Sequence, residues 1–280
     1  MKSGKQKHVY AAMAALFITI FALPAQAQNL YENEPTTTYD LKIANTDVTS
    51  DNCNDLSKIP GVSGTVSYNP QTKTLTLQDA TIDIQEDNAI LSYIDDLTVK
   101  VTGTNNLSSS KATISFRAPL TITGGGTLNL QSEKDCALYI NATKLTIDNC
   151  TLSAKSKVYG ISGAEGIREK VAVTNATVIA EGTKYGSICD IAELTLTGCS
   201  ITEPMGAIFD PDKRAVVLML NNEIVKSKVI ISKDPTGIEA PVADTAAPQG
   251  IFTLSGVRLP DDAQLSKGIY IVNGKKVVKQ

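Results

Sequence analysis

The chain has 280 residues, with 26 Lys and Arg against 29 Asp and Glu, and a formal net charge of −3. This balance argues against nucleic acid as a partner, because nucleic-acid binding needs a basic surface. The single histidine, His8, and the absence of tryptophan limit imidazole chemistry and leave only Tyr and Phe as aromatic platforms.

A secretory signal is predicted in residues 1–27. Lys2, Lys5 and Lys7 precede an apolar stretch at residues 9–23, and Ala-Gln-Ala at residues 25–27 is typical of a cleavage site. Cleavage would remove His8, and with it any imidazole base, His-ligated zinc or Ser-His-Asp system. We therefore expect no catalytic residue, metal site or cofactor. No other stretch is apolar over 18 or more residues, so no transmembrane span is expected in the mature chain.

The segment 28–66 is expected to close the start of the fold. Residues 39–43 alternate apolar and polar side chains, and residues 62–68 do so again, as in strands with one buried face. A stack of strands needs such a cap, because an uncovered terminal strand offers its backbone to other chains.

Residues 67–233 contain a repeat that indicates the fold. A strand of mostly apolar-Thr-apolar pattern starts six times, at spacings of 22, 23, 25, 26 and 23 residues. The starts are Leu75, Leu97, Leu120, Leu145, Val171 and Leu194. A second column of small residues follows in phase, at Ala89, Ala112, Ala137, Gly160, Gly186 and Gly206. Strand repeats of this length without helical periodicity predict an all-β solenoid, a right-handed parallel β-helix of about six turns.

Four of the repeats share a bend. The fifth position is Asp79, Asn149, Asn175 or Gly198, types that tolerate a left-handed backbone, and a small residue follows each. Cys150 and Cys199 are two of these small residues. They are expected to be buried and free, because two strand spacings separate them by roughly 9 to 10 Å, too far for a disulfide. The spacing leaves open whether any of Cys53, Cys136 and Cys189 forms a disulfide.

Two sets of side chains are candidate binding residues. The first is a row of outward threonines, which could be an ordinary solvated strand surface or a flat hydroxyl face that meets a polysaccharide or ice. Its members are Thr76, Thr98, Thr121, Thr146 and Thr195. The second is Tyr159 with Tyr185, which precede the small residues of consecutive turns and should stack, with Met205 on the next turn. They form either an outward strip for a sugar ring or part of the core.

An enzymatic alternative uses the charged loop at residues 162–170. Arg168 or Lys170 could act as the base of a polysaccharide lyase, with Glu165 and Asp148 nearby. A charged surface corner without catalytic function is the simpler interpretation. A glycosidase would need two carboxyl groups about 5 to 10 Å apart, and the sequence shows no such cluster.

Three segments follow the repeats. Residues 215–231 predict two closing strands joined by a tight turn. Residues 234–249, with Pro235, Pro241 and Pro248, predict a linker. Residues 250–280 predict a separate module, in which Asn273-Gly274 between apolar strands indicates a type I′ hairpin.

Two stretches resemble known families. The ending GIYIVNGKKVVKQ resembles the C-terminal sorting domains of type IX secretion substrates in Bacteroidota. Residues 39–52 and 64–82 are similar to secreted β-helix proteins of gut bacteria loosely described as carbohydrate-binding. The resemblance implies a cell-surface, extracellular or periplasmic location and supplies no catalytic residues.

The sequence thus favours an exported noncatalytic protein that binds a polysaccharide, cell-surface glycan or matrix on a β-helix face. A polysaccharide lyase or glycosidase acting on an acidic polysaccharide is one alternative. A structural component of a surface assembly is the other.

Overall fold

The structure is a computed structural model that describes residues 35–233 and 250–279. The expected signal segment, with His8, and the expected linker lie outside the described residues. Within the described residues the regular structure is β-strand, apart from one short 3-10 helix, η1 (Leu56–Lys58). No helix in this part of the chain is long and apolar enough to cross a membrane.

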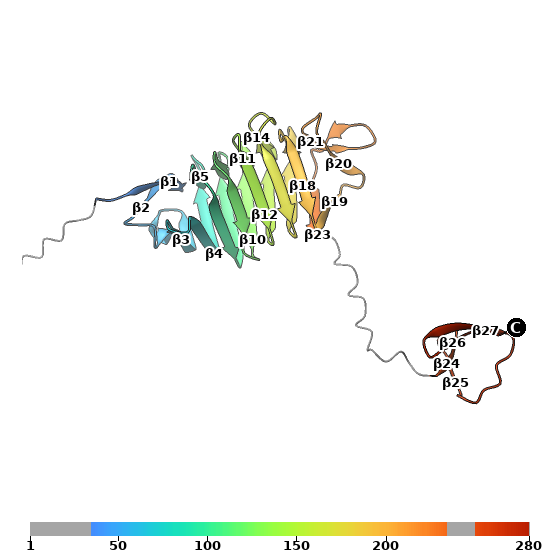
Figure 1. The fold of residues 1–280 in the computed structure, drawn as a ribbon. Helices are drawn as coiled ribbons and strands as arrows, with labels where there is room; N and C mark the ends of the chain where they lie inside the picture. The colour runs from blue at the N-terminus through green and yellow to red at the C-terminus, as the bar shows by residue number, and fades with distance from the viewer. Residues whose placement is uncertain (1–34, 234–249, 280) are drawn as a thin grey trace, which may run out of the picture. The chain divides into compact units, whose positions relative to one another are not determined.

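Residues 74–197 form a parallel β-solenoid with three faces (Figure 1). The first face stacks the first half of β4 (Thr74–Ile84) with β6 (Leu97–Thr102), β9 (Leu120–Thr123), β12 (Lys144–Asp148), β15 (Lys170–Thr174) and β18 (Glu193–Thr197). The second face stacks the second half of β4 with β7 (Thr104–Ser109), β10 (Thr127–Ser132), β13 (Thr151–Ser156) and β16 (Thr177–Gly182). The third face stacks β5 (Ile90–Ser92), β8 (Ile114–Phe116), β11 (Cys136–Ile140), β14 (Tyr159–Gly163) and β17 (Gly186–Cys189).

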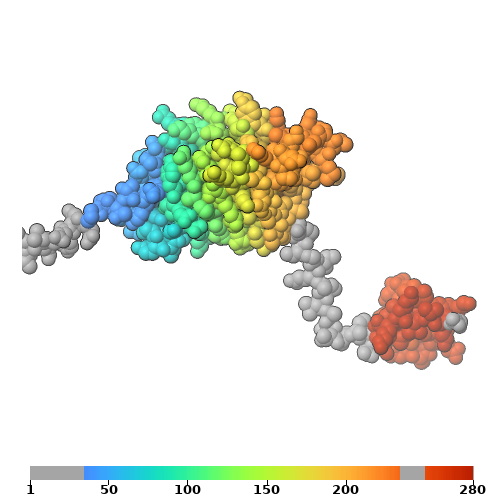
Figure 2. All heavy atoms as spheres, turned by 45° about the horizontal axis from the view of Figure 1, so that its top comes forward, coloured from blue at the N-terminus to red at the C-terminus, as the bar shows by residue number. Residues whose placement is uncertain are grey.

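The all-β parallel solenoid expected from the repeat is confirmed, with a smaller number of turns. Five turns contribute a strand to every face. The sixth turn has β18 on the first face, but its next strand, β19 (Cys199–Glu203), pairs with β23 (Val229–Lys233) instead of β16. Figure 2 shows the successive turns following one another in colour along the solenoid.

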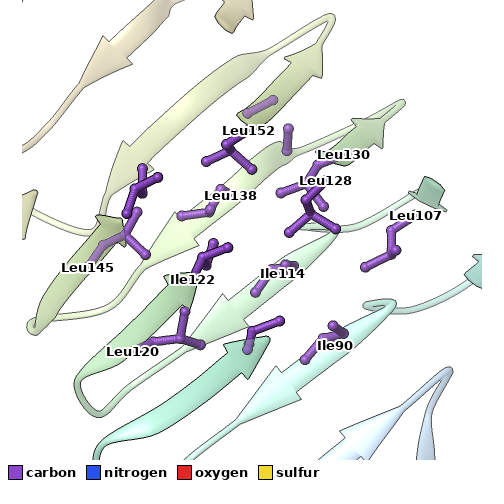
Figure 3. Packing of buried hydrophobic residues seen from close by; sticks show 14 of the residues in the cluster. Ile90, Leu107, Ile114, Leu120, Ile122, Leu128, Leu130, Leu138, Leu145 and Leu152 are labelled. Atoms are coloured by element: carbon purple, nitrogen blue, oxygen red, sulfur yellow. The ribbon is translucent and has the colours of Figure 1, made fainter. Parts of the chain in front are cut away.

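Columns of apolar side chains from successive turns fill the interior. Ile90, Ile114 and Leu138 lie in register on the third face and are buried, and Figure 3 shows them among leucines from the other two faces. Alternation along each strand sends every second side chain inward, and equal turns bring the same positions together. The apolar-Thr-apolar pattern therefore becomes two inward columns with a solvated row between them.

The four predicted bends take the expected backbone. Asp79, Asn149, Asn175 and Gly198 all have positive φ, between 45° and 61°. The small residues that follow them, Ala80, Cys150, Ala176 and Cys199, are buried. A left-handed residue turns the chain sharply enough for the next small side chain to enter the core.

Two details of the predicted columns are wrong. Thr74, and not Thr76, lies in register with Thr98, so Thr76 belongs to the neighbouring row beside Lys100. On the third face Thr113 is aligned with Ala137, and Ser187 with Gly160, each one residue beyond the predicted Ala112 and Gly186. Bends of unequal length shift the register, which is fixed by hydrogen bonds between turns.

Antiparallel strands cover the start of the solenoid. β3 (Val62–Asn69) pairs with β4, while β1 (Thr38–Ile43) pairs with β5 and with β2 (Thr46–Thr49). Tyr39 and Tyr68 pack edge to face, with ring centroids 5.3 Å apart.

The closing segment differs from the expected pair of strands. β20 (Ala207–Asp210), β21 (Ala215–Leu218) and β22 (Glu223–Ile224) form a separate antiparallel sheet. β23 follows as an independent strand between β16 and β19. The predicted second closing strand is therefore divided between two sheets.

The five cysteines, all within the described residues, are buried and form no disulfide bond. The expectation for Cys150 and Cys199 is confirmed, and the question left open for Cys53, Cys136 and Cys189 is answered in the same way. These side chains act as small apolar residues.

Residues 250–279 form a small antiparallel sheet in the order β25 (Arg258–Leu259), β24 (Ile251–Thr253), β26 (Gly268–Val272) and β27 (Lys275–Lys279). Asn273 and Gly274, with φ of 50° and 77°, connect β26 to β27. Positive φ at both positions matches the predicted type I′ hairpin.

Candidate functional site

The outer surface of the third face carries the candidate site. Its strands run in register, so that Tyr159 lies between Cys136 and Gly186, and Ser162 between Tyr139 and Cys189. Adjacent parallel strands are ~4.8 Å apart, so side chains at matching positions touch from turn to turn.

Tyr159 and Tyr185 form a stacked pair on this surface. Their ring centroids are 5.0 Å apart with an interplanar angle of 28°. Tyr185 is 46% exposed and Tyr159 partly exposed, so the pair faces outward. The Lys184 ammonium lies 4.8 Å from the Tyr185 centroid. Met205 does not extend the pair, because the strand after it, β20, pairs with β21 and not with β17.

A second aromatic group lies toward the start of the solenoid. The Arg117 guanidinium is 5.4 Å from the centroid of Tyr93, which is 46% exposed. Tyr139 lies on the next turn, in register with Ser115, which precedes Arg117 by two residues. Cation–π contacts hold such side chains against one another at the surface.

These residues form a diagonal across the third face. From the first turn to the fifth, each tyrosine lies nearer the start of its strand than the tyrosine before it, as the register from β5 to β17 shows. We call this set the tyrosine track: Tyr93, Arg117, Tyr139, Tyr159 and Tyr185. It contains all four tyrosines of residues 74–233. Sequence spacing alone revealed only Tyr159 and Tyr185, since the other members occupy different strand positions.

A polar cluster lies beside Tyr139, whose strand position Ser162 takes on the following turn. The Ser162 hydroxyl is 3.3 Å from Asp190 Oδ2 and 3.1 Å from the Gly163 carbonyl oxygen. Burial raises the pKa of the Cys189 thiol to about 12 and that of Cys136 still further above its ordinary value. Both thiols are therefore protonated near neutral pH, and a thiol is a poor nucleophile.

Burial also raises the pKa values of Tyr139 and Tyr159, and nearby Cys136 and Asp190 respectively add to the effect. Both side chains are then neutral phenols at physiological pH, able to donate a hydrogen bond. The surface thus offers aromatic rings, hydroxyl groups and the Asp190 carboxylate.

The charged loop does not gather the side chains proposed for a lyase. Lys170 pairs with Glu193, Nζ to Oε2, at 2.8 Å. Glu165 accepts a hydrogen bond from Arg214 through its backbone carbonyl, and Asp148 lies on the first face in register with Thr174. Among the described residues, no three His, Cys, Asp or Glu side chains converge as a metal site would require.

Glu169, which the sequence did not single out, organises this loop. It is 1% exposed. Its Oε1 accepts a hydrogen bond from the Ala142 amide at 3.0 Å, and its Oε2 accepts from Ile167 at 2.9 Å and Arg168 at 3.1 Å. Burial opposes the charged form, but the backbone donors outweigh it and lower the pKa of Glu169.

The Glu169→Gln variant is expected to lose stability in a pH-dependent manner. A carboxyl group whose pKa is lower in the folded state stabilises the fold above its unfolded pKa, and that contribution disappears as the pH falls through the folded pKa. The wild-type advantage in the free energy of unfolding should therefore be about 1–3 kcal/mol at pH 7 and shrink in acid. Urea unfolding of both proteins at a series of pH values measures it. A difference that stays constant with pH would contradict this role.

The predicted threonines lie on the first face, not on the track. Thr98, Thr121, Thr146 and Thr195 form one row with Ala172, and Thr76 lies in the next. The second face has a further row that the sequence analysis missed, although Thr recurs there at spacings of 23, 24 and 26 residues: Thr104, Thr127, Thr151 and Thr177. Beside it, Asn129 donates a hydrogen bond to Asn106 at 2.9 Å.

Hollows in the surface occur elsewhere. One of about 610 Å³ and one of about 630 Å³ are lined mainly by residues of the closing sheet and its loops, among them Leu218. A groove of about 250 Å³ lies along Lys155, Glu181 and neighbouring residues at the ends of β10, β13 and β16. The tyrosine track is therefore a sheet surface that lies apart from these hollows.

A scan against protein-family models, a search of curated proteins and a search of solved structures each gave no match.

Proposed function

We propose that this chain is an exported binding protein whose tyrosine track holds a glycan. The observation that carries the proposal is the stacked, outward pair Tyr159 and Tyr185 on a rigid parallel sheet. Tyrosine combines an apolar ring face with a polar hydroxyl group, which suits a ligand that has both kinds of surface. A strand scaffold also keeps the rings in place before binding, which lowers the entropic cost.

The extended form of the track supports a chain-like ligand over a single sugar. Tyr93 and Tyr185 lie on the first and fifth turns, separated along the solenoid axis by four strand spacings, about 19 Å. The partly exposed carboxylate of Asp190, on the fifth turn, can accept hydrogen bonds from ligand hydroxyl groups.

Glycan-array binding by the full chain tests the proposal. The double variant Tyr159→Ala/Tyr185→Ala is expected to bind the selected glycan about 5- to 150-fold more weakly, since each aromatic contact contributes about 0.5–1.5 kcal/mol beyond its buried area. The control Thr121→Val/Thr146→Val changes the first face only and should bind like wild type. Loss of binding in the control alone would place the site on the threonine rows, and the absence of any bound glycan would refute the proposal.

The same experiment separates binding from catalysis. Glycans that bind should be recovered intact, with no new reducing ends and no unsaturated products. Release of such products would favour the polysaccharide lyase or glycosidase alternative.

We propose further that the chain is exported to the cell surface, the extracellular space or the periplasm. Support comes from the signal-like residues 1–27 and from the tail that resembles type IX sorting domains. Fractionation of cells expressing the chain with and without residues 250–280 tests the role of the tail. Equal surface amounts would contradict a sorting function.

A further inference from the structure

The ends of the solenoid are covered unequally. At the start, β3 covers β4, and β1 covers β5. At the other end β23 covers β16, and the amides of Ser187 and Ile191, in and after β17, donate to the carbonyl oxygens of Val225 and Arg214. Among the described strands that end a parallel stack, β18 alone has a free side, because its one partner is β15.

The other outermost strands carry features that discourage pairing with another chain. The ladder of β1 and β2 has a bulge, and β3 has one at Gly64, between Ser63 and Thr65. β19 has a bulge between Ile201 and Glu203 and is followed by Pro204. Bulges and proline interrupt a strand edge so that a second strand cannot extend the sheet.

β18 has none of these features. Its five residues, Glu193 to Thr197, keep one register with β15 and contain no proline or lysine. The charge of Glu193 is already paired with Lys170. A regular edge without protection is a template for strand addition.

The backbone of β18 presents its unpaired groups outward at Leu194 and Leu196. The carbonyl oxygen of Thr197, within the strand, accepts a hydrogen bond from the Asn175 amide at 2.9 Å, so Thr197 faces β15. Bonding partners alternate along a strand, so Thr195 also bonds toward β15, and Leu194 and Leu196 point their N–H and C=O groups to the open edge. Leu194 and Leu196 remain partly exposed because no following turn covers them.

We propose that the occupant of this edge is β18 of a second copy, paired antiparallel about a two-fold axis at Thr195. This register sets Leu194 of one copy beside Leu196 of the other, which covers the partly exposed leucines of both. Glu193 then lies opposite Thr197, so no like charges meet. Two-fold symmetry also gives the open edge of β18 a hydrogen-bonding partner in both molecules at once.

The dimer should be concentration-dependent. Pairing two five-residue strands covers less area than the roughly 1,200–2,000 Å² of a standard stable interface. Association is therefore expected to appear at micromolar or higher concentrations. It does not depend on glycan binding, because β18 lies on the first face and the tyrosine track on the third.

Sedimentation velocity of the full chain over a concentration series tests the proposal. Wild type should shift from monomer to dimer as its concentration rises. Thr195→Lys sets two ammonium groups side by side at the axis, so its dimer should be at least about tenfold weaker. The matched control Thr146→Lys is in the same row, two turns inside the stack, and should dimerise like wild type. A monomeric wild type, or equal effects of the two lysines, would overturn the proposal.

Crosslinking provides a positive test that does not depend on a disruptive variant. Thr195→Cys should be captured as a covalent dimer by a short bis-maleimide, since the two positions form a non-hydrogen-bonded pair at about 4.5 Å between Cα atoms. Thr146→Cys, separated from its counterpart by about five strand spacings or 24 Å, should not be captured. The native cysteines are buried, so the wild-type chain is the blank. Failure of Thr195→Cys to crosslink would overturn the two-fold register.

Discussion

Replacing Phe116 by alanine is expected to lower the free energy of unfolding by about 3–5 kcal/mol. Phe116 is fully buried on β8, in register with Ser92 on one side and Ile140 on the other. It is among the largest fully buried side chains, so its truncation leaves a cavity in the core. Chemical denaturation of the full chain, followed by circular dichroism, measures the loss.

The control for this prediction is Leu220→Ala. Leu220 is 98% exposed, so its truncation should change the free energy of unfolding by less than about 0.5 kcal/mol. A similar loss in both variants would mean that the interior around β8 is not the tightly packed core described above.

Gly163→Ala is expected to be destabilising by more than about 3 kcal/mol, although it adds a single methyl group. A Cβ at Gly163 would lie 1.8 Å from the Asp190 carbonyl oxygen and 2.7 Å from Glu169 Cγ. The first contact is with the backbone of the next turn, so β14 and β17 would have to separate. Thermal unfolding and denaturant titration report the effect.

Gly125→Ala separates this collision from backbone strain. Gly125 has φ of +81°, but no atom lies within 4 Å of the position that an added methyl group would take. Its replacement should cost about 1–2 kcal/mol, the usual cost of a left-handed alanine. If Gly163→Ala costs no more than Gly125→Ala, the close approach of the two turns is not needed for stability.

The repeat was readable from the sequence because its signals are local. Alternation along a strand, a left-handed residue at the bend and a small residue after it all lie within a few positions. They predicted the bends at Asp79 and Asn149 and the buried places of Cys150 and Cys199. The Asn-Gly turn in residues 250–279 was found in the same way.

The register between turns was harder to predict from the sequence. Thr76 was placed in the row of Thr98, and Ala112 and Gly186 in the column of Ala137, although the structure shifts each of them. Hydrogen bonding between turns selects the register, and a loop can gain or lose a residue without changing the pattern of either strand. The division of the closing segment between two sheets has the same origin.

The candidate site shows more clearly what could not be predicted from the sequence. Tyr159 and Tyr185 could be paired from their spacing, but Tyr93 and Tyr139 join them only when the register of five strands is known. Glu169 looked like one charge in a charged loop. Its role depends on the Ala142 amide, 27 residues earlier in the chain, which the preceding turn brings to 3.0 Å.

The amino-acid sequence by itself determined the repeating strand, its bends, its inward columns and the closed hairpin near the end of the chain, because each of these follows from neighbouring residues. Only the tertiary structure decided which side chains share a face, which carboxylate is buried among backbone amides and which strand keeps an open edge. Those properties depend on contacts between turns more than 20 residues apart, where a shift of one residue changes every neighbour.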